Sequence, residues 1–122
     1  MALQIAIVED RQPDAQRLQT LIRRELGESE CSIFSSGDAY LQQLPARQDD
    51  VVFLDICMEG TNGIQTAQQL RRADPEVLIV FVTSSPEYVW EAFPVHPFDY
   101  LLKPYQEEKF CQLAAELRRG LC

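Results

Sequence analysis

The sequence has no long apolar segment and few basic residues. No run of apolar residues approaches the roughly 20 that a membrane-spanning helix requires, so we expect no membrane contact. The chain opens on a strand-like run without a basic leader, which predicts no signal peptide and a cytoplasmic location. The chain has 11 Lys and Arg residues against 19 Asp and Glu residues, for a formal net charge of −8. Because nucleic-acid binding needs a basic surface, this balance argues against direct binding of DNA or RNA.

Residues that could bind zinc are also scarce. The chain has one histidine, His96, and four cysteines, none of them in a CxxC pair. A zinc site needs better ligand spacing, so we expect reduced thiols and a structural or exposed His96. The cysteines are Cys31, Cys57, Cys111 and Cys122.

The length of the chain favours one domain over residues 1–122. A chain of 122 residues is near the commonest domain size, and it buries about two-thirds of the surface that its unfolded form exposes. Its 46% share of hydrophobic residues is ordinary for a globular protein. We therefore expect one domain with a hydrophobic core of its own.

The stretch Val51–Leu54, followed at once by Asp55, organises the prediction of the fold. Four apolar residues, rich in β-branched and aromatic types, are typical of a strand buried on both faces, as in a parallel sheet. An ionised carboxylate is costly in such surroundings, so Asp55 should lie where the strand leaves the core. In open parallel sheets, this carboxyl edge is where ligands bind.

Strand-like and helix-like segments alternate five times along the chain. Their short connections predict right-handed crossovers and therefore a doubly wound α/β fold, in which helices cover both faces of a five-stranded parallel sheet. The expected strands are Leu3–Val8, Cys31–Phe34, Val51–Leu54, Val77–Val82 and Phe98–Leu102. The expected helices cover about Pro13–Leu26, Ala39–Leu44, Ile64–Ala73, Glu87–Phe93, which stops before Pro94, and Gln106–Arg119.

Polar residues follow four of these strands. Glu9 and Asp10 follow the first, Asp55 the third, Thr83 the fourth and Lys103 the fifth. Because the carboxyl ends of the strands share one edge, these side chains can converge in one cleft. Carboxylates suit Mg²⁺, a carboxylate beside Mg²⁺ can attack a phosphoryl group, and a hydroxyl and an ammonium can bind the phosphoryl oxygens. The pattern indicates phosphoryl-transfer chemistry.

The order of these motifs resembles the receiver domains of two-component response regulators. The motifs are Glu9-Asp10, Asp55-Ile56-x-Met58-x-x-x-Asn62-Gly63, Thr83-Ser84 and Lys103-Pro104, and they span essentially the whole chain. The resemblance implies a flavodoxin-like fold of five βα units with strand order 2-1-3-4-5. It also implies a signalling switch that is phosphorylated by a sensor histidine kinase, with intrinsic autophosphorylation and slow autodephosphorylation but no other enzyme activity.

The resemblance assigns residues to the phosphoryl group and to the metal ion. Asp55 would be the phosphoacceptor, and Lys103 would pair with the phosphoryl group. Mg²⁺ would be held by Asp10, Asp55, the backbone carbonyl of Cys57 and, through water, Glu9.

The resemblance also implies how the switch is read. Thr83 would move toward the phosphoryl group, and Tyr100 would turn inward with it. The Lys103–Pro104 peptide bond would be cis. The face of the fourth helix, fifth strand and fifth helix would bind partners or form a homodimer, and an exposed Trp90 would suggest such an interface.

Within the family, the segment Phe98–Pro104 is similar to receivers joined to LytTR-type DNA-binding domains. No such effector is present in this sequence, so we expect either an excised receiver or a stand-alone one. Glu59 departs from the usual proline, which predicts a less stiff loop after the phosphoacceptor. Cys57 and Ser85 occupy positions that flank the path of attacking water and tune the lifetime of the phosphoryl group.

Three other functions compete with this interpretation. A phosphatase of the aspartyl-phosphate kind usually has a second carboxylate two residues after its nucleophile, where this chain has Cys57. A flavodoxin-like cofactor binder needs a phosphate-binding loop after the first strand, where Glu9 and Asp10 would repel a phosphate. The third alternative is a degenerate receiver that acts only through protein contacts, independently of phosphorylation.

Overall fold

The five strands that the structure describes lie in one parallel sheet. The computed structural model describes residues 2–27, 29–58 and 60–121, and the predictions that concern Glu59 and Cys122 lie outside these ranges. The strand order is β2-β1-β3-β4-β5, which confirms the prediction. The strands are β1 (Leu3–Val8), β2 (Ser29–Phe34), β3 (Val51–Leu54), β4 (Leu78–Thr83) and β5 (Asp99–Leu102).

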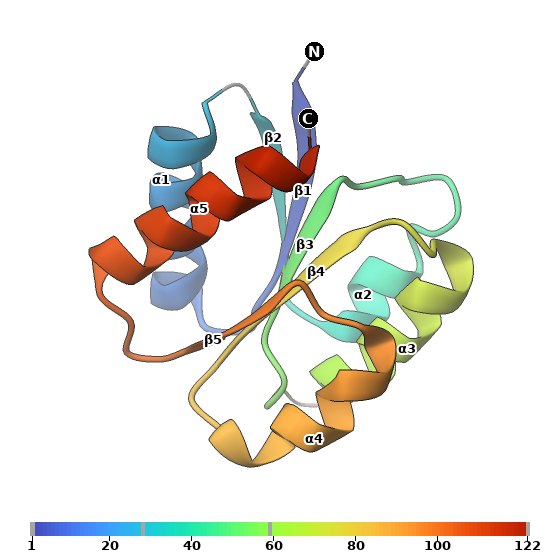
Figure 1. The fold of residues 1–122 in the computed structure, drawn as a ribbon. Coiled ribbons are helices and arrows are strands. Elements are labelled where there is room, and N and C mark those ends of the chain that lie inside the picture. Colours follow the sequence, from blue (N-terminus) through green and yellow to red (C-terminus); the bar gives the residue numbers. More distant parts are fainter. Residues whose placement is uncertain (1, 28, 59, 122) are drawn as a thin grey trace.

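Helices cover both faces of the sheet (Figure 1). On one face lie α1 (Gln12–Leu26) and α5 (Glu107–Leu121), which share a hydrophobic core with alternate residues of the strands. The other face is covered by α2 (Gly37–Leu41), α3 (Gly63–Ala73), η1 (Pro86–Tyr88), α4 (Val89–Ala92) and η2 (Phe93–Val95). None of the helices described is long and apolar enough to cross a membrane.

Helix α1 illustrates how the sequence specifies an element and its buried face. Pro13 lies in the first turn, where its missing N–H leaves no hydrogen bond unmade, and Gly27 follows the last residue with a φ of 65°. Its buried residues recur at helical spacing, so that one stripe packs on the sheet. They are Ala15, Leu18, Leu21, Ile22 and Leu26.

The prediction of one helix over Glu87–Phe93, stopping before Pro94, was wrong. The segment is divided into η1, α4 and η2, and the helical path continues through Pro94 to Val95. Pro94 lies in the first turn of η2, a position that needs no N–H donor. His96 ends the segment with a φ of 54°, and its exposed side chain agrees with the expectation for this residue.

The second helix also differs from its prediction over Ala39–Leu44. It covers Gly37–Leu41, because the Ser36 hydroxyl accepts a hydrogen bond from the Ala39 N–H at 3.0 Å and fixes an earlier start. The described cysteines are free thiols, as expected, and they are Cys31, Cys57 and Cys111.

Candidate functional site

Three carboxylates meet where β1 and β3 end. Glu9 and Asp10 follow β1 and Asp55 follows β3, and one carboxylate oxygen of each lies within 4.8 Å of the others. Glu9 and Asp55 are buried, with 5% and 6% exposure, whereas Asp10 is exposed. The structure therefore brings together the three acidic residues that the sequence predicts at this edge.

The backbone around Asp55 is closely held. Its N–H donates to the Val8 carbonyl at 3.0 Å, and its Oδ1 accepts from the Ile56 N–H at 2.7 Å. The N–H of Gly63 donates to the Ile56 carbonyl at 2.9 Å, which brings the start of α3 against the loop. A Cβ on Gly63 would lie 2.1 Å from the Asp55 carbonyl oxygen, so this approach requires glycine.

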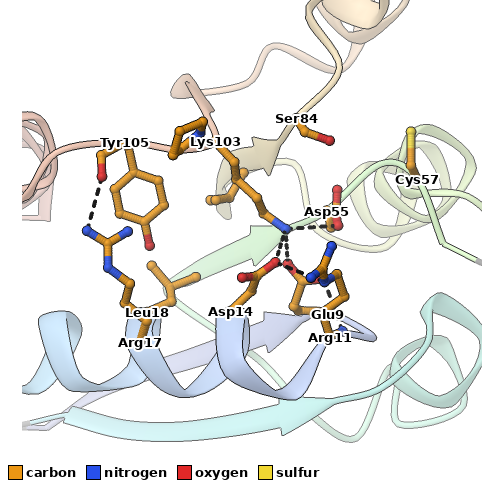
Figure 2. Close-up of a pocket in the computed structure, with 12 residues that line it drawn as sticks. Glu9, Arg11, Asp14, Arg17, Leu18, Asp55, Cys57, Ser84, Lys103 and Tyr105 are labelled. Carbon is orange, nitrogen blue, oxygen red and sulfur yellow. Dashed lines mark hydrogen bonds and ion pairs between the residues drawn. The ribbon is translucent and has the colours of Figure 1, made fainter.

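Lys103 reaches the carboxylates from the segment after β5 (Figure 2). Its Nζ donates to Glu9 Oε1 at 2.6 Å, to Asp14 Oδ2 at 2.9 Å and to Asp55 Oδ2 at 3.2 Å. One ammonium thus contacts three carboxylates and neutralises part of their mutual repulsion. The peptide bond between Lys103 and Pro104 is cis.

The surroundings shift the pKa values of both members of the closest ion pair. Burial, with the negative charge of Asp55, raises the pKa of Glu9 to about 7, and the hydrogen bond from Lys103 offsets only part of that rise. Burial lowers the pKa of Lys103, but its hydrogen bonds to Glu9 and Asp14 and the charge of Asp55 outweigh this and raise it. Lys103 therefore stays a cation, while Glu9 can exchange a proton near neutral pH.

Thr83 ends β4 at the same edge but is fully buried. Its hydroxyl accepts a hydrogen bond from the Ser85 N–H at 3.4 Å, and its carbonyl accepts from the Lys103 N–H at 2.8 Å. A cavity of about 400 Å³ opens beside Asp55, and Ser84 rather than Thr83 lines it. Of the five side chains expected to converge, Glu9, Asp55 and Lys103 line this cavity, whereas Asp10 and Thr83 do not.

Tyr100 and Cys57 both contact Ser85, in the loop after β4. The Tyr100 hydroxyl donates to the Ser85 carbonyl, and its half-buried ring packs on Phe81 at a centroid distance of 5.9 Å. Burial, with a contribution from the charge of Glu87, raises the pKa of Tyr100 to about 12. The Cys57 Sγ lies 3.2 Å from the Ser85 Oγ, and Cys57 lines the cavity. These contacts link the loops that follow β3 and β4.

Residues of α1, and Arg11 just before it, also line the site, although the sequence motifs did not predict them. Asp14, Arg17 and Arg11 line the cavity, together with Tyr105 from the segment after β5 (Figure 2). Arg17 stacks on the Tyr105 ring at 4.4 Å and donates to the Tyr105 carbonyl at 3.0 Å. The sequence did contain one indication of these residues. Because α1 begins directly after the Glu9-Asp10 pair, its first turns must lie beside the carboxyl edge.

The chemistry of the site fits a hard divalent cation. Three carboxylates that share one edge, one of them open to solvent, supply oxygen ligands and leave room for the water molecules that Mg²⁺ retains. Glu9, Asp10 and Asp55 are the residues that would hold such an ion. The neighbouring Lys103 and the cavity lined by Ser84 provide donors for an anionic group that approaches Asp55.

Comparisons with known proteins agree with this geometry. The family model for the response regulator receiver domain matches residues 5–115. The sensory transduction protein LytT of Oceanobacillus iheyensis is 34% identical over 99% of this chain and 50% of the relative. An uncharacterised response regulatory protein of Yersinia pestis is 40% identical over 98% of this chain and 50% of the relative. The chain thus spans about half the length of these curated relatives.

The fold also matches a solved structure. The response regulatory domain of protein mrkE from Klebsiella pneumoniae superposes with a TM-score of 0.91 at 33% identity, over 97% of this chain and 97% of that chain.

Proposed function

Because the chain belongs to the family of response regulator receiver domains of two-component signalling, we propose that Asp55 accepts a phosphoryl group from a sensor histidine kinase in a Mg²⁺-dependent reaction. The observation that supports this proposal is the group of charged side chains around the Asp55 carboxylate. Its carboxylate lies within 4.8 Å of Glu9 and Asp10 and 3.2 Å from the Lys103 ammonium. Receiver domains are generally not enzymes, and this one would act in the cytoplasm as a phosphoacceptor.

Each residue at the carboxyl edge would have its own role in the phosphoryl transfer. An oxygen of Asp55 forms a bond to phosphorus while the P–N bond to the histidine of the kinase breaks, and the imidazole leaves with the electron pair of that bond. The Ile56 N–H, 2.7 Å from Asp55 Oδ1, orients the carboxylate. Lys103 donates to the phosphoryl oxygens as their charge develops. Glu9, Asp10 and Asp55, with the Cys57 carbonyl, would hold Mg²⁺, whose positive charge would stabilise the negative charge of the transferred phosphoryl group.

Readout of the phosphoryl group would begin at Thr83 and Tyr100. The Thr83 hydroxyl is engaged by the Ser85 N–H, and the Tyr100 hydroxyl is bonded to the carbonyl of the same serine. A Thr83 hydroxyl that turns toward a phosphoryl oxygen loses its bond to Ser85. That loss would free the loop after β4, and the Tyr100 ring would turn inward.

The output face would be the one formed by α4, β5 and α5. The apolar side chains of Val89, Trp90, Phe93 and Leu102, here called the apolar patch, are exposed on α4, η2 and β5. Trp90 is 80% exposed and Phe93 67%, which is unusual for side chains of this size. We assign this face to homodimerisation and to control of a LytTR-type DNA-binding effector, in keeping with the similarity to LytT.

Intact-mass measurement tests the phosphoacceptor directly. We expect the wild type to gain one phosphoryl group on incubation with acetyl phosphate and Mg²⁺, and to gain none when EDTA replaces the Mg²⁺. Asp55→Asn should abolish the gain, because an amide cannot form the acyl phosphate. Glu76→Gln, which removes an exposed carboxylate just before β4, is the control that should leave the gain unchanged.

One alternative function has the same fold but involves no phosphorylation of Asp55. The apolar patch would also suit a degenerate receiver that binds a partner without phosphorylation. That reading predicts no mass gain with acetyl phosphate or with any histidine kinase, and identical partner binding by the wild type and Asp55→Asn.

A further inference from the structure

We propose that Asp14 is a positioning residue that holds the Lys103 ammonium on the α1 side of the cleft and thereby slows phosphorylation of Asp55. This inference rests on the proposed function of Asp55. It concerns a carboxylate in the first turn of α1, outside the motifs that identify the family, whose Oδ2 lies 2.9 Å from Lys103 Nζ.

The hydrogen bonds of Lys103 are fully committed in this structure. An ammonium has three N–H donors, and the three donors of Lys103 meet Glu9, Asp14 and Asp55. The contact with Asp55, at 3.2 Å, is longer than those with Glu9 at 2.6 Å and Asp14 at 2.9 Å. The lysine side chain is only 16% exposed, so water offers little replacement for a lost carboxylate partner. The ammonium is therefore drawn away from the phosphoacceptor and toward β1 and α1.

Asp14 differs from the other two partners of Lys103. Glu9 and Asp55 belong to the carboxylate cluster that would hold Mg²⁺, whereas that cluster, as found among the described residues, does not include Asp14. When the ion is bound, Glu9 and Asp55 would interact both with it and with Lys103, so each would attract Lys103 less strongly. Asp14 shares its carboxylate with Arg11 at 3.7 Å, an exposed and weak pairing, so its attraction for Lys103 persists when the cluster binds a cation.

This arrangement should slow phosphorylation of Asp55 in two ways. A hydrogen bond that Lys103 gives to Asp14 is withheld from the phosphoryl oxygens, which need it as charge develops. Asp14 also lines the same cavity as Asp55, so its negative charge repels a phosphodonor that enters. Removing the charge of Asp14 should therefore speed phosphorylation. Asp14 thus opposes the reaction that Lys103 assists.

The test compares rates of phosphorylation at saturating Mg²⁺ with acetyl phosphate as the donor. We expect Asp14→Asn to react roughly three to ten times faster than the wild type, the effect of a weakened, partly exposed charge pair. Asp14→Glu, which keeps the charge, should react at a rate close to that of the wild type. Glu76→Gln, which removes an exposed carboxylate just before β4, at the other end of the strand from the cleft, should leave the rate unchanged.

A second measurement observes Lys103 before any phosphorylation. The ¹⁵N resonance of Lys103 Nζ should shift in Asp14→Asn and return close to its wild-type position in Asp14→Glu, because the hydrogen bond itself is being changed. A general loosening of α1 would affect both variants and would broaden backbone signals of the helix, so this pattern supports a positioning role.

The outcomes separate this inference from the proposed function. If the wild type takes up a phosphoryl group and Asp14→Asn reacts at the wild-type rate or more slowly, Asp14 does not restrain Lys103 and the inference is overturned. A faster Asp14→Glu would overturn it too, since the charge is retained there. If the wild type gains no phosphoryl group from any donor, the function proposed for Asp55 fails first, and the inference fails with it.

Discussion

Glu9 is a residue of the site whose charge changes with pH near neutrality. Buried beside Asp55, it has a pKa raised to about 7, although Lys103 donates to it at 2.6 Å. Its carboxylate is protonated below that pH and ionised above it. Since a metal ion binds the ionised form, protons would compete near neutral pH with the Mg²⁺ that Glu9 is proposed to hold.

We therefore predict that the affinity for Mg²⁺ falls as the pH is lowered from 8 to 6. The fall should approach, at most, about tenfold per pH unit below the pKa, as expected for displacement of one proton. Isothermal titration calorimetry over this range measures it. In Glu9→Gln the affinity should be weaker at pH 8 and should change less with pH. Equal slopes in the two proteins would show that another group controls the dependence.

For single residues, the sequence predicts membership of the site better when the residue follows a strand than when it lies on a helix. Glu9, Asp10, Asp55 and Lys103 could be placed together because the ends of parallel strands share an edge. Asp14 was missed because its position in the first helical turn is explained equally well by the helix dipole. Its contact with Lys103 depends on how closely α1 packs beside β5, a tertiary distance that spans 89 positions in the sequence.

Helix α3 lies against Asp55 through Gly63, and this close approach connects the helix to the candidate site. The N–H of Gly63 bonds the Ile56 carbonyl, and its Cα faces the Asp55 carbonyl oxygen at a separation that leaves no space for a methyl group. The Asn62 side chain caps the same helix by accepting from the Gln65 N–H at 2.9 Å. The start of α3 thus fixes the loop that carries Asp55.

We predict that Gly63→Ala lowers the free energy of unfolding by about 1–3 kcal/mol, as expected for overpacking against rigid backbone. Its added Cβ would lie 2.1 Å from the Asp55 carbonyl oxygen. Gly120→Ala in α5 is the matched control, because its Cβ would meet the nearest atom, on Phe98, at 3.5 Å. That variant should gain about 0.5–1 kcal/mol from helix propensity. Urea unfolding of both variants is the measurement, and equal losses would contradict the steric explanation.

Arg71 ties the end of α3 to the segment that follows α4. Its guanidinium donates to backbone carbonyls on two separate stretches of chain and is partly buried. The accepting carbonyls belong to Asp74, Pro75, Val77, Val95 and His96. The bond to Val77, at 2.7 Å, adjoins the start of β4.

Replacing this side chain should release both stretches. We predict that Arg71→Ala lowers the free energy of unfolding by about 1–3 kcal/mol, because buried carbonyls lose a charged donor. Arg72→Ala removes an exposed neighbour of the same type and should change it by less than about 0.5 kcal/mol. Thermal or urea unfolding distinguishes the two. Similar effects of both substitutions would mean that the carbonyls find water in place of the guanidinium.

The segmented fourth helix shows where prediction of elements reaches its limit. The strands were predicted to within two residues because their apolar runs are short and bounded by polar residues. The helical path includes Pro94, which a first helical turn tolerates, and it ends at Val95, whose carbonyl accepts from Arg71, 24 positions earlier in the chain. A local pattern cannot contain this long-range contact.

At the scale of the whole molecule, the large apolar side chains that remain exposed among the described residues belong to α4, η2 and β5. Burial elsewhere is thorough, with the two hydrophobic cores on opposite faces of the sheet. The apolar patch instead lies outside both cores and includes Trp90 and Phe93. Exposure of such residues is costly unless another surface covers them, which supports a role in association.

We predict that phosphorylation increases association of the wild type and that Trp90→Ser and Phe93→Ser weaken it at least threefold. Each variant should remain folded, because the side chain that it removes is at least 67% exposed. Sedimentation velocity with and without acetyl phosphate measures the change. Gln68→Ser, on the exposed side of α3, is the control. Unchanged association in both patch variants would assign the patch to a different partner.

The order in which the ribosome makes this chain bears on how its acidic edge is completed. Glu9, Asp10 and Asp55 are synthesised before Lys103, which follows Asp55 by 48 residues. Strands β1 to β4 can pair before β5, an edge strand, leaves the ribosome. Until then the clustered carboxylates repel one another without their ammonium partner. Electrostatics therefore favours bringing the carboxylates of this edge together late in the folding of the sheet, after β5 and Lys103 have been made.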